Sequence, residues 1–325
     1  MRIIFMGTPD FAASVLKPLA ESRHTVVLAV SQPDRPKGRG HATVPTDVHR
    51  AADALGIPVL QPEKVRAADC VETLRSYQPD LIVVAAFGQI LPRRILDLPK
   101  YGCINVHPSL LPKYRGAAPI PWAIKNGDGV TGVTIMRMSP GMDEGDILAQ
   151  EEIAVDPEET ADSLFEKAAA VSGPLLLSAI DAIEAGTALP VPQDSAKATY
   201  SKKITKEDAR VDWTAPSDQL DAFVRALTSD PGAWTRLDGK VVKFWKVKSI
   251  PASDLEGVER AAAEVGDPCG TVISVTKKWF DVLCGTGALR VRELQMQGKK
   301  RMDAGAFLRG FRLKPGARFE GREEA

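Results

Sequence analysis

The stretch LIVVAAF, residues 81–87, is apolar at every position, as is typical of a strand buried on both faces of a sheet. Similar short apolar strands are predicted at 2–6, 25–30, 57–60 and 103–107. Between them, apolar residues at helical spacing predict helices at 9–21, 46–55, 63–76 and 118–125. Strands that alternate with helices in this way indicate an α/β fold whose mostly parallel sheet is covered on both faces. Strands at 130–138 and 147–155 and a long helix at 160–186 continue the pattern.

The pattern changes after residue 187. A polar stretch with two prolines and no periodicity follows, which predicts a linker at 188–206 between domains at 1–187 and 207–325. Two domains are also expected because 325 residues exceed what one core usually organises. Beyond the linker, a helix at 216–227 and strands at 233–237, 240–250, 270–276, 279–284 and 288–296 favour a small β-barrel or sandwich.

Composition places the chain among ordinary globular proteins. No apolar run approaches the roughly 20 residues that a membrane span needs, and the N-terminus lacks the layout of a signal peptide. We therefore expect a cytoplasmic protein that does not engage a membrane. The four cysteines and four histidines are scattered without metal-ligand spacing, so we expect reduced, mostly buried thiols and no metal.

The charge is balanced overall but not along the chain. Residues 200–325 carry 23 lysines and arginines against 18 aspartates and glutamates, so residues 1–199 carry the compensating negative charge. A basic C-terminal part favours a polyanion that docks on one side, although solvated surfaces also reach such values.

The segment CINVHPSLLP, residues 103–112, places two polar side chains on one strand. Asn105 and His107 point to the same side because side chains alternate along a strand, and Pro108 ends the ladder after His107. An amide and an imidazole therefore project at the carboxyl end of a strand, where open α/β sheets bind ligands. Asn105 can donate to an oxyanion, and His107 can donate or accept a proton. The alternative is a turn-capping amide beside a core histidine.

Three loops each allow more than one interpretation. The loop GTPD at 7–10 has one glycine where a dinucleotide site needs three, so it begins a helix or faces a substrate. The loop GMDEGD at 141–146 is a solvated turn, a calcium loop, or the source of an acid, Asp143, that orients His107. The basic loop at 32–40 is a disordered surface loop or an arm that contacts a phosphate backbone.

Taken together, these segments resemble a known family. The runs INVHPSLLPKYRGAAPI at 104–120 and GVTIMRMSPGMDEGDI at 132–147 are similar to the folate-dependent formyltransferases. FMGTPDFA at 5–12, QPDRPKGRG at 32–40 and TYSKKITKEDARVDW at 199–213 are similar to the branch that acts on methionyl-tRNA. The resemblance covers nearly the whole chain. It implies a Rossmann-like catalytic domain followed by an OB-like β-barrel domain that helps to bind tRNA.

The resemblance also implies roles for individual residues. The formyl donor would be 10-formyltetrahydrofolate, the acceptor initiator methionyl-tRNA, and the enzyme a monomer without a metal. The catalytic set would be Asn105, His107 and Asp143. The folate would contact Ser109, Leu110, Leu111, Pro112, Phe87, Gly88, Ile90 and Leu91. The tRNA would contact Arg35, Lys37, Arg39, Lys202 and Lys203.

Two rival functions remain open at this point. A formyltransferase that acts on an amino sugar nucleotide would share the catalytic motifs, but it needs no basic arm at 32–40. A nucleic-acid-binding module with an inactive catalytic domain would not need the full set of Asn105, His107 and Asp143.

Overall fold

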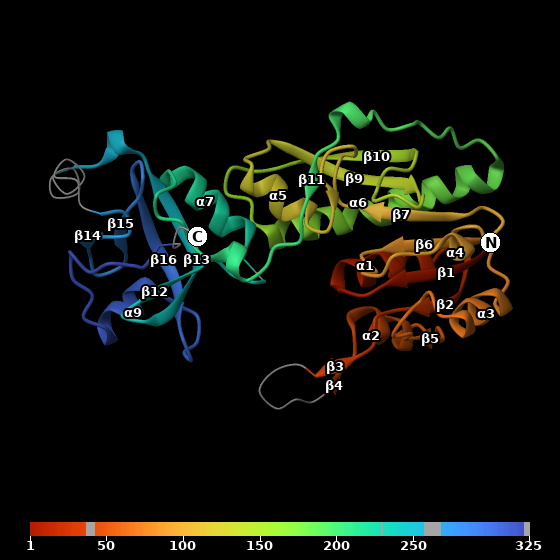
Figure 1. The fold of residues 1–325 in the computed structure, drawn as a ribbon, viewed down its shortest axis with the longest axis horizontal. Helices are drawn as coiled ribbons and strands as arrows, with labels where there is room; N and C mark the ends of the chain where they lie inside the picture. Colours follow the sequence, from red (N-terminus) through yellow and green to blue (C-terminus); the bar gives the residue numbers. More distant parts are fainter. Residues whose placement is uncertain (37–42, 229, 257–267, 322–325) are drawn as a thin grey trace. The chain divides into compact units, whose positions relative to one another are not determined.

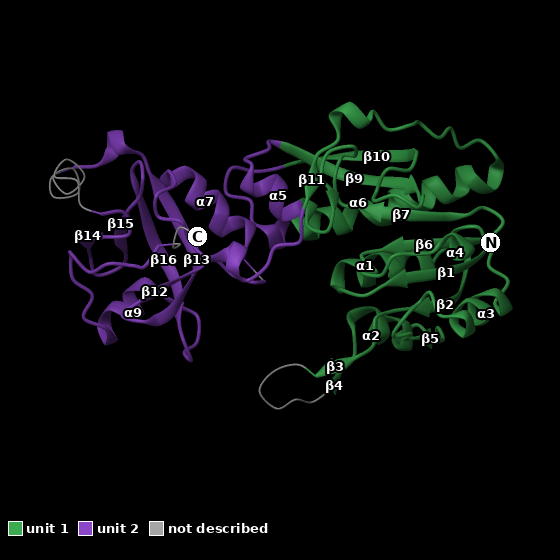
Figure 2. Cartoon of the chain, viewed as in Figure 1, with its two compact units in different colours: residues 1–119, 130–154, 164–201 green, residues 120–129, 155–163, 202–325 purple. Residues whose placement is uncertain are grey.

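The computed structural model describes residues 1–36, 43–228, 230–256 and 268–321. The chain divides into two compact units (Figure 2). Unit 1 contains residues 1–119, 130–154 and 164–201, and unit 2 contains residues 120–129, 155–163 and 202–325.

Unit 1 is built on a seven-stranded sheet in the order β10-β9-β7-β6-β1-β2-β5 (Figure 1). The five strands from β7 to β5 run parallel; β9 is antiparallel to β7, and β10 is antiparallel to β9. The strands are β1 (Arg2–Gly7), β2 (Thr25–Val30), β5 (Val59–Leu60), β6 (Leu81–Ala85), β7 (Cys103–His107), β9 (Val130–Arg137) and β10 (Ile147–Ala154).

Helices cover both faces of this sheet. On one face, Ile4 and Met6 of β1 pack in a cluster with Val71 and Leu74 of α3 and Ile95 of α4. On the other face α1 packs against β1, β2 and β6, and its Phe11 ring lies 6.2 Å from the Phe165 ring of α6. The helices are α1 (Asp10–Ala20), α2 (Asp47–Ala54), α3 (Ala68–Ser76), α4 (Arg93–Leu96) and α6 (Ala161–Ala185).

Several elements differ from the sequence prediction. The helix predicted at 63–76 begins only at Ala68, because the backbone N–H of Val65 donates to Gln89 Oε1 at 2.8 Å and holds that stretch as a loop. Short strand pairs were not predicted: β3 (Arg35–Pro36) with β4 (Thr43–Val44), and β8 (Arg115–Gly116) with β11 (Tyr200–Ser201). The predicted linker includes β11 and a 3₁₀ turn (Ser195–Lys197).

Helix α6 corrects the expectation that no apolar stretch approaches a membrane span. By length and composition alone it could cross a membrane. That is weak support for a span, because a core helix passes the same test. Leu164, Leu176 and Ile180 of α6 are fully buried, as expected for a core helix.

Unit 2 is an antiparallel sheet in the order β12-β13-β16-β15-β14, with β17 paired to β16. Its edge strands are joined by the segment 317–320, which hydrogen-bonds Arg236 of β12 through Glu320 and Val272 of β14 through Ala317. The strands are β12 (Trp234–Leu237), β13 (Lys240–Ile250), β14 (Val272–Val275), β15 (Phe280–Leu283), β16 (Ala288–Met296) and β17 (Met302–Asp303). The remaining helices are α5 (Pro119–Lys125), α7 (Ser217–Ala226), α9 (Ala304–Gly310) and 3₁₀ turns at Glu207–Ala209 and Ala252–Asp254. Both parts of the predicted fold class are confirmed.

An aromatic cluster forms the hydrophobic core of unit 2. Trp213, Phe244, Phe280 and Phe319 are each 1% exposed or less. The Phe319 ring lies 5.8 Å from Trp213, 5.6 Å from Phe244 and 5.9 Å from Phe280. The segment that joins the two sheet edges therefore also supplies the ring at the centre of the core.

We predict that Phe319→Ala lowers the free energy of unfolding by about 3–5 kcal/mol, because it empties the centre of a packed core. Chemical denaturation followed by tryptophan fluorescence measures the change, since Trp213 contacts Phe319. The control is Phe165→Ala, whose ring is 36% exposed and should cost much less. Equal losses in the two variants would contradict this account of the core.

Candidate functional site

The strand β7 presents Asn105 and His107 at the carboxyl end of the parallel sheet. Asn105 lies opposite Val84 of β6 and Met136 of β9, and His107 lies opposite Thr134 of β9. Both side chains are almost buried, at 9% and 4% exposed. In the described part of the chain, no protein group hydrogen-bonds the Asn105 amide. Its N–H groups are therefore free to donate to a ligand.

The orientation of the His107 ring is fixed by a backbone carbonyl. His107 Nε2 lies 2.9 Å from the carbonyl oxygen of Tyr114, and since a carbonyl can only accept, Nε2 is the protonated nitrogen. The other nitrogen, Nδ1, faces Asp143 Oδ2 at 3.8 Å. When the ring is protonated, its second N–H lies at Nδ1, between the carboxylate and the space beside Asn105.

The loop that carries Asp143 has to fold back to bring this residue close to His107. The preceding strand, β9, runs antiparallel to β7, so it ends beside Cys103, away from His107. The β9–β10 loop returns toward His107 and places Asp143 in the left-handed region, with φ of 49°. The backbone N–H of Gly116 donates to Asp143 Oδ2 at 2.8 Å. Left-handed backbone at a non-glycine residue is strained, and such strain persists where surrounding contacts enforce it.

The loop after His107 is tied to β9 and β10. Thr134 Oγ1 donates to the Ser109 carbonyl at 2.6 Å and accepts from the Leu111 N–H at 3.1 Å. Gln150 Nε2 donates to the Leu111 carbonyl at 2.9 Å. Ser109 and Leu111 are consequently buried, whereas Leu110 and Pro112 are half-buried and present surface at the site.

The four residues predicted after β6 separate into two pairs. Phe87 and Leu91 are 2% and 5% exposed and pack into the core beneath the sheet. Gly88, with φ of +84°, is exposed, and Ile90 is 84% exposed. A ligand over this segment would therefore meet Gly88 and Ile90 directly, and Phe87 and Leu91 would support them from below.

Sequence reasoning missed a cavity of about 390 Å³ beside the start of β7. It is lined partly by apolar groups, among them Leu96, Cys103 and Met138. Ser139 Oγ, also in its lining, is buried and has no hydrogen-bond partner among the described residues. Burial raises the pKa of the Cys103 thiol to about 12, so this cysteine is not a thiolate nucleophile. Cys103, Met138 and Ser139 stand in motifs quoted above, but nothing in those runs indicates a cavity.

The predicted tRNA contacts lie on the surface where they are described. Arg35 begins β3 and pairs with Glu63 at 3.3 Å. Lys202 pairs with Asp208 at 3.0 Å, and Lys203 is exposed. Lys37 and Arg39 lie outside the described residues.

Asp34 holds the base of the β3–β4 pair. Its carboxylate accepts hydrogen bonds from Gln61 Nε2 at 2.7 Å and from the Thr46 N–H at 3.0 Å, and it lies 2.9 Å from His49 Nδ1. Burial works to raise the pKa of Asp34, but the bonds from Gln61, His49 and Thr46 outweigh it and hold this pKa below the ordinary value. One carboxylate thus joins the two ends of the segment that carries Arg35.

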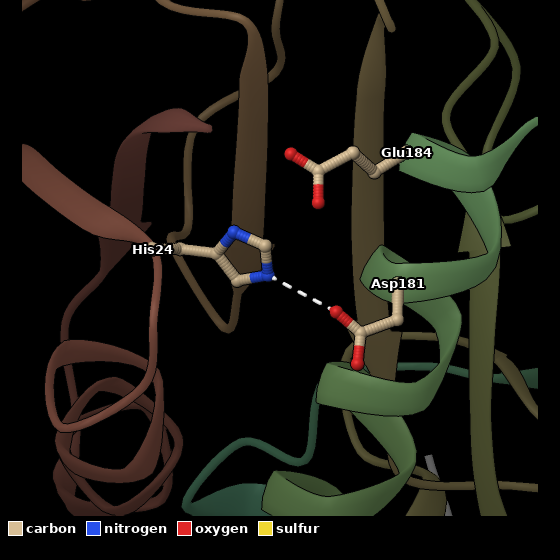
Figure 3. A group of neighbouring side chains, drawn as sticks. All are labelled: His24, Asp181 and Glu184. Atoms are coloured by element: carbon tan, nitrogen blue, oxygen red, sulfur yellow. Dashed lines mark ion pairs between the residues drawn. The ribbon is translucent and has the colours of Figure 1, made fainter.

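Three further side chains have the chemistry of a metal site. His24 is buried and faces Asp181 and Glu184 of α6, with His24 Nε2 3.4 Å from Asp181 Oδ1 (Figure 3). Both carboxylates also pair with the Arg23 guanidinium, whose bond to Asp181 is 2.7 Å, and the pKa of Asp181 is accordingly held below its ordinary value. Because a permanent cation already engages both carboxylates, the group is better explained as an ion-pair network between α6 and the turn before β2.

Comparisons with known proteins agree with this arrangement. The formyl transferase family model matches residues 1–180, and the model for the formyl transferase C-terminal domain matches residues 203–312. The methionyl-tRNA formyltransferase of Agathobacter rectalis is 47% identical over 319 residues, which cover 98% of this chain and 99% of the relative. That of Geotalea daltonii is 44% identical over the full length of both chains.

Solved structures share the fold at lower identity. HypX from Aquifex aeolicus in complex with tetrahydrofolic acid has a TM-score of 0.64 at 20% identity, over 95% of this chain and 47% of that one. The sugar 3N-formyl transferase WlaRD has a TM-score of 0.61 at 17% identity, over 92% of this chain and 99% of that one. At these identities the likeness concerns the fold alone.

We predict that Asp34→Asn flattens the acid limb of the stability curve. The pKa of Asp34 is lower in the folded state than in the unfolded state, so the ionised carboxylate stabilises the fold. This stabilisation is complete at pH values above the pKa of the unfolded state, and it is lost as the pH falls through the pKa of the folded state. The free energy of unfolding of both proteins is measured from about pH 7 to pH 3, with the unfolded pKa near 3.9. The difference between them should be constant above about pH 5 and shrink below it. Parallel curves over the whole range would show that Asp34 carries no such linkage.

Proposed function

Because the chain belongs to the methionyl-tRNA formyltransferase family, we propose that it transfers the formyl group of 10-formyltetrahydrofolate to the α-amino group of initiator methionyl-tRNA. The observation that carries the catalytic assignment is the unpaired Asn105 amide beside a His107 ring held between Tyr114 and Asp143. We place the reaction in the cytoplasm and assign it to a monomer.

The chemistry is an acyl transfer. The lone pair of the amine nitrogen attacks the formyl carbon, a C–N bond forms, and the carbonyl oxygen takes up negative charge. The bond from that carbon to N10 of the folate then breaks, the amine loses a proton and N10 gains one. An enzyme accelerates this reaction by stabilising the oxyanion and by moving the proton.

Asn105 and His107 fit these two tasks. The Asn105 amide donates to the developing oxyanion, and because His107 Nε2 is engaged by Tyr114, the Nδ1–H is the ring donor that can assist. Asp143 Oδ2 faces Nδ1 at 3.8 Å, a distance that leaves the Nδ1–H accessible to a substrate. The same carboxylate can accept the proton that the amine loses, through His107 or a water molecule.

The folate assignment rests on the surface that surrounds this set. Leu110, Pro112, Gly88 and Ile90 present surface there, while Phe87, Leu91, Ser109 and Leu111 hold the two loops in place. We assign the ring system of the folate to the surface formed by the segments 87–91 and 109–112, which follow β6 and β7 at the edge of the sheet that carries Asn105 and His107. The exposed apolar side chain of Ile90 suits contact with an aromatic ring.

The tRNA assignment rests on exposed cations. Arg35, Lys202 and Lys203 would contact phosphates. Lys37 and Arg39 follow Arg35 in the same basic loop of the sequence. Such contacts make binding fall steeply with salt. The sugar formyl transferases remain distant in sequence, so an amino sugar nucleotide is the less favoured acceptor.

We predict formylated product with methionyl-tRNA and none with an amino sugar nucleotide when each is incubated with the protein and 10-formyltetrahydrofolate. The product is detected by acid gel electrophoresis for the tRNA and by mass spectrometry for the sugar nucleotide. Formylation of the sugar nucleotide alone would overturn the proposal, and absence of both products would favour the inactive nucleic-acid-binding module.

We also predict that Asn105→Ala lowers turnover about a hundredfold or more, because loss of one oxyanion donor costs about 2.7–4 kcal/mol of barrier. Filter binding should show unchanged affinity for tRNA. The matched control is Asn126→Ala at an exposed position, with turnover expected to stay at the level of the unmodified protein. Turnover that barely changes in Asn105→Ala would remove Asn105 from the catalytic set.

A further inference from the structure

A polar segment that leads into the motif at 199–213 contacts both the chain that follows His107 and the loop that carries Asp143. This segment, residues 191–201, is here called the strap. It begins at Val191, which exchanges two 2.8 Å backbone hydrogen bonds with Ile147 at the start of β10. It ends as β11, which pairs in parallel with β8. The strap therefore connects the far side of the Asp143 loop to the chain that follows His107.

The end of the strap fixes the carbonyl that orients His107. The Arg115 N–H donates to the Thr199 carbonyl at 2.8 Å, and the Tyr114 N–H donates to Thr199 Oγ1 at 2.8 Å. Ser201 Oγ donates to the Tyr114 carbonyl at 3.1 Å, the same oxygen that accepts from His107 Nε2. Hydrogen bonds with Thr199 and Ser201 thus hold the Tyr114 backbone that orients His107.

The start of the strap fixes the loop that carries Asp143. Gln193 Nε2 donates to the Asp143 carbonyl at 2.8 Å and to the Gly145 carbonyl at 2.7 Å. Its oxygen, Oε1, accepts from Nε and a terminal nitrogen of Arg115 at 3.0 and 2.8 Å. Arg115 is only 3% exposed, so its guanidinium has little access to water as a replacement acceptor.

These contacts leave one orientation for the Gln193 amide. Arg115 can only donate and the two carbonyls can only accept, so the amide cannot turn over without losing all four contacts. Both N–H groups of the amide bond the backbone that follows the left-handed Asp143, at the carbonyls of Asp143 and Gly145. Gln193 touches neither His107 nor the Asp143 carboxylate, and its influence on them passes through the loop backbone.

We propose that Gln193 is a positioning residue for formyl transfer: it holds the strained turn at Asp143 so that the carboxylate faces His107 Nδ1. The inference rests on the proposed function, in which that carboxylate takes up the proton of the amine through His107. Without the two amide bonds, Asp143 keeps the bond from the Gly116 N–H but loses two contacts that oppose relaxation of its turn, and the 3.8 Å approach to His107 is no longer fixed.

The test is a double-mutant cycle that joins Gln193→Glu with Asp143→Asn. Gln193→Glu keeps the acceptor for Arg115 and the side-chain shape, but it removes both N–H donors to the loop. The rate constant of formyl transfer is measured in single-turnover reactions with enzyme in excess, so that slow variants stay measurable. We expect a fall of about ten- to a hundredfold in the otherwise unmodified protein, with KM for methionyl-tRNA and for the formyl donor changed less than about twofold. In the Asp143→Asn background the same substitution should change turnover by less than about twofold.

Two further variants serve as controls for this experiment. Gln219→Glu makes the same chemical change at an exposed position of α7 and should leave turnover unaffected. Gln193→Ala removes the donors without adding a charge, and it should reproduce the fall in turnover if Gln193→Glu does not fold.

The possible outcomes separate the two hypotheses. Equal falls in both backgrounds, or a change confined to KM, would show that Gln193 does not act through Asp143 and would overturn the inference while the proposed function stands. Full activity of Asp143→Asn alone would remove Asp143 from the catalytic set and overturn the inference with it. Failure of the unmodified protein to formylate methionyl-tRNA would instead refute the proposed function.

Discussion

The hydrogen bond from His107 Nε2 to the Tyr114 carbonyl determines what the site can do. It consumes one ring nitrogen, fixes the plane of the ring and leaves Nδ1 as the only ring atom that can face both Asp143 and a substrate. A histidine at the end of a strand would otherwise be free to rotate about χ2. The 2.9 Å bond removes that freedom without a charged partner, and the Asp143 carboxylate lies on the other side of the ring, 3.8 Å from Nδ1.

The mixed direction of the sheet makes that second contact possible. If β9 ran parallel to β7, an acid after β9 would meet His107 at the same sheet edge. Because β9 is antiparallel, its end lies at the opposite edge, and the loop must fold back to bring Asp143 to Nδ1. That return requires a left-handed turn at Asp143 and contacts that hold it, which Gly116 and Gln193 provide. The strap is therefore needed because of the topology of the sheet.

The sequence predicted the parallel strands well because each is apolar nearly throughout, and it placed Asn105 and His107 on one face because side chains alternate along a strand. It could not predict the contacts of Gln193, Thr134 or Tyr114, since these bonds join residues between 7 and 87 positions apart and leave no local periodicity. The stretch 188–206 was predicted as a linker from its polarity. Yet polar side chains also serve as hydrogen-bonding partners, and composition does not distinguish the two uses.

Two of the exposed cations assigned to tRNA are already paired with carboxylates, Arg35 with Glu63 and Lys202 with Asp208. These pairs do not prevent a phosphate from binding, because exposed ion pairs contribute only about 0–1 kcal/mol. The carboxylates instead restrict where each cation can lie before the polyanion arrives. Backbone and side-chain bonds from Thr205, together with Lys202, hold the pKa of Asp208 below its ordinary value, so this carboxylate stays ionised and anchored when Lys202 exchanges it for a phosphate. Exchange of one anion for another costs less than bringing an unpaired, fully hydrated ammonium group into contact, so under the proposed function these ion pairs would oppose tRNA binding only weakly.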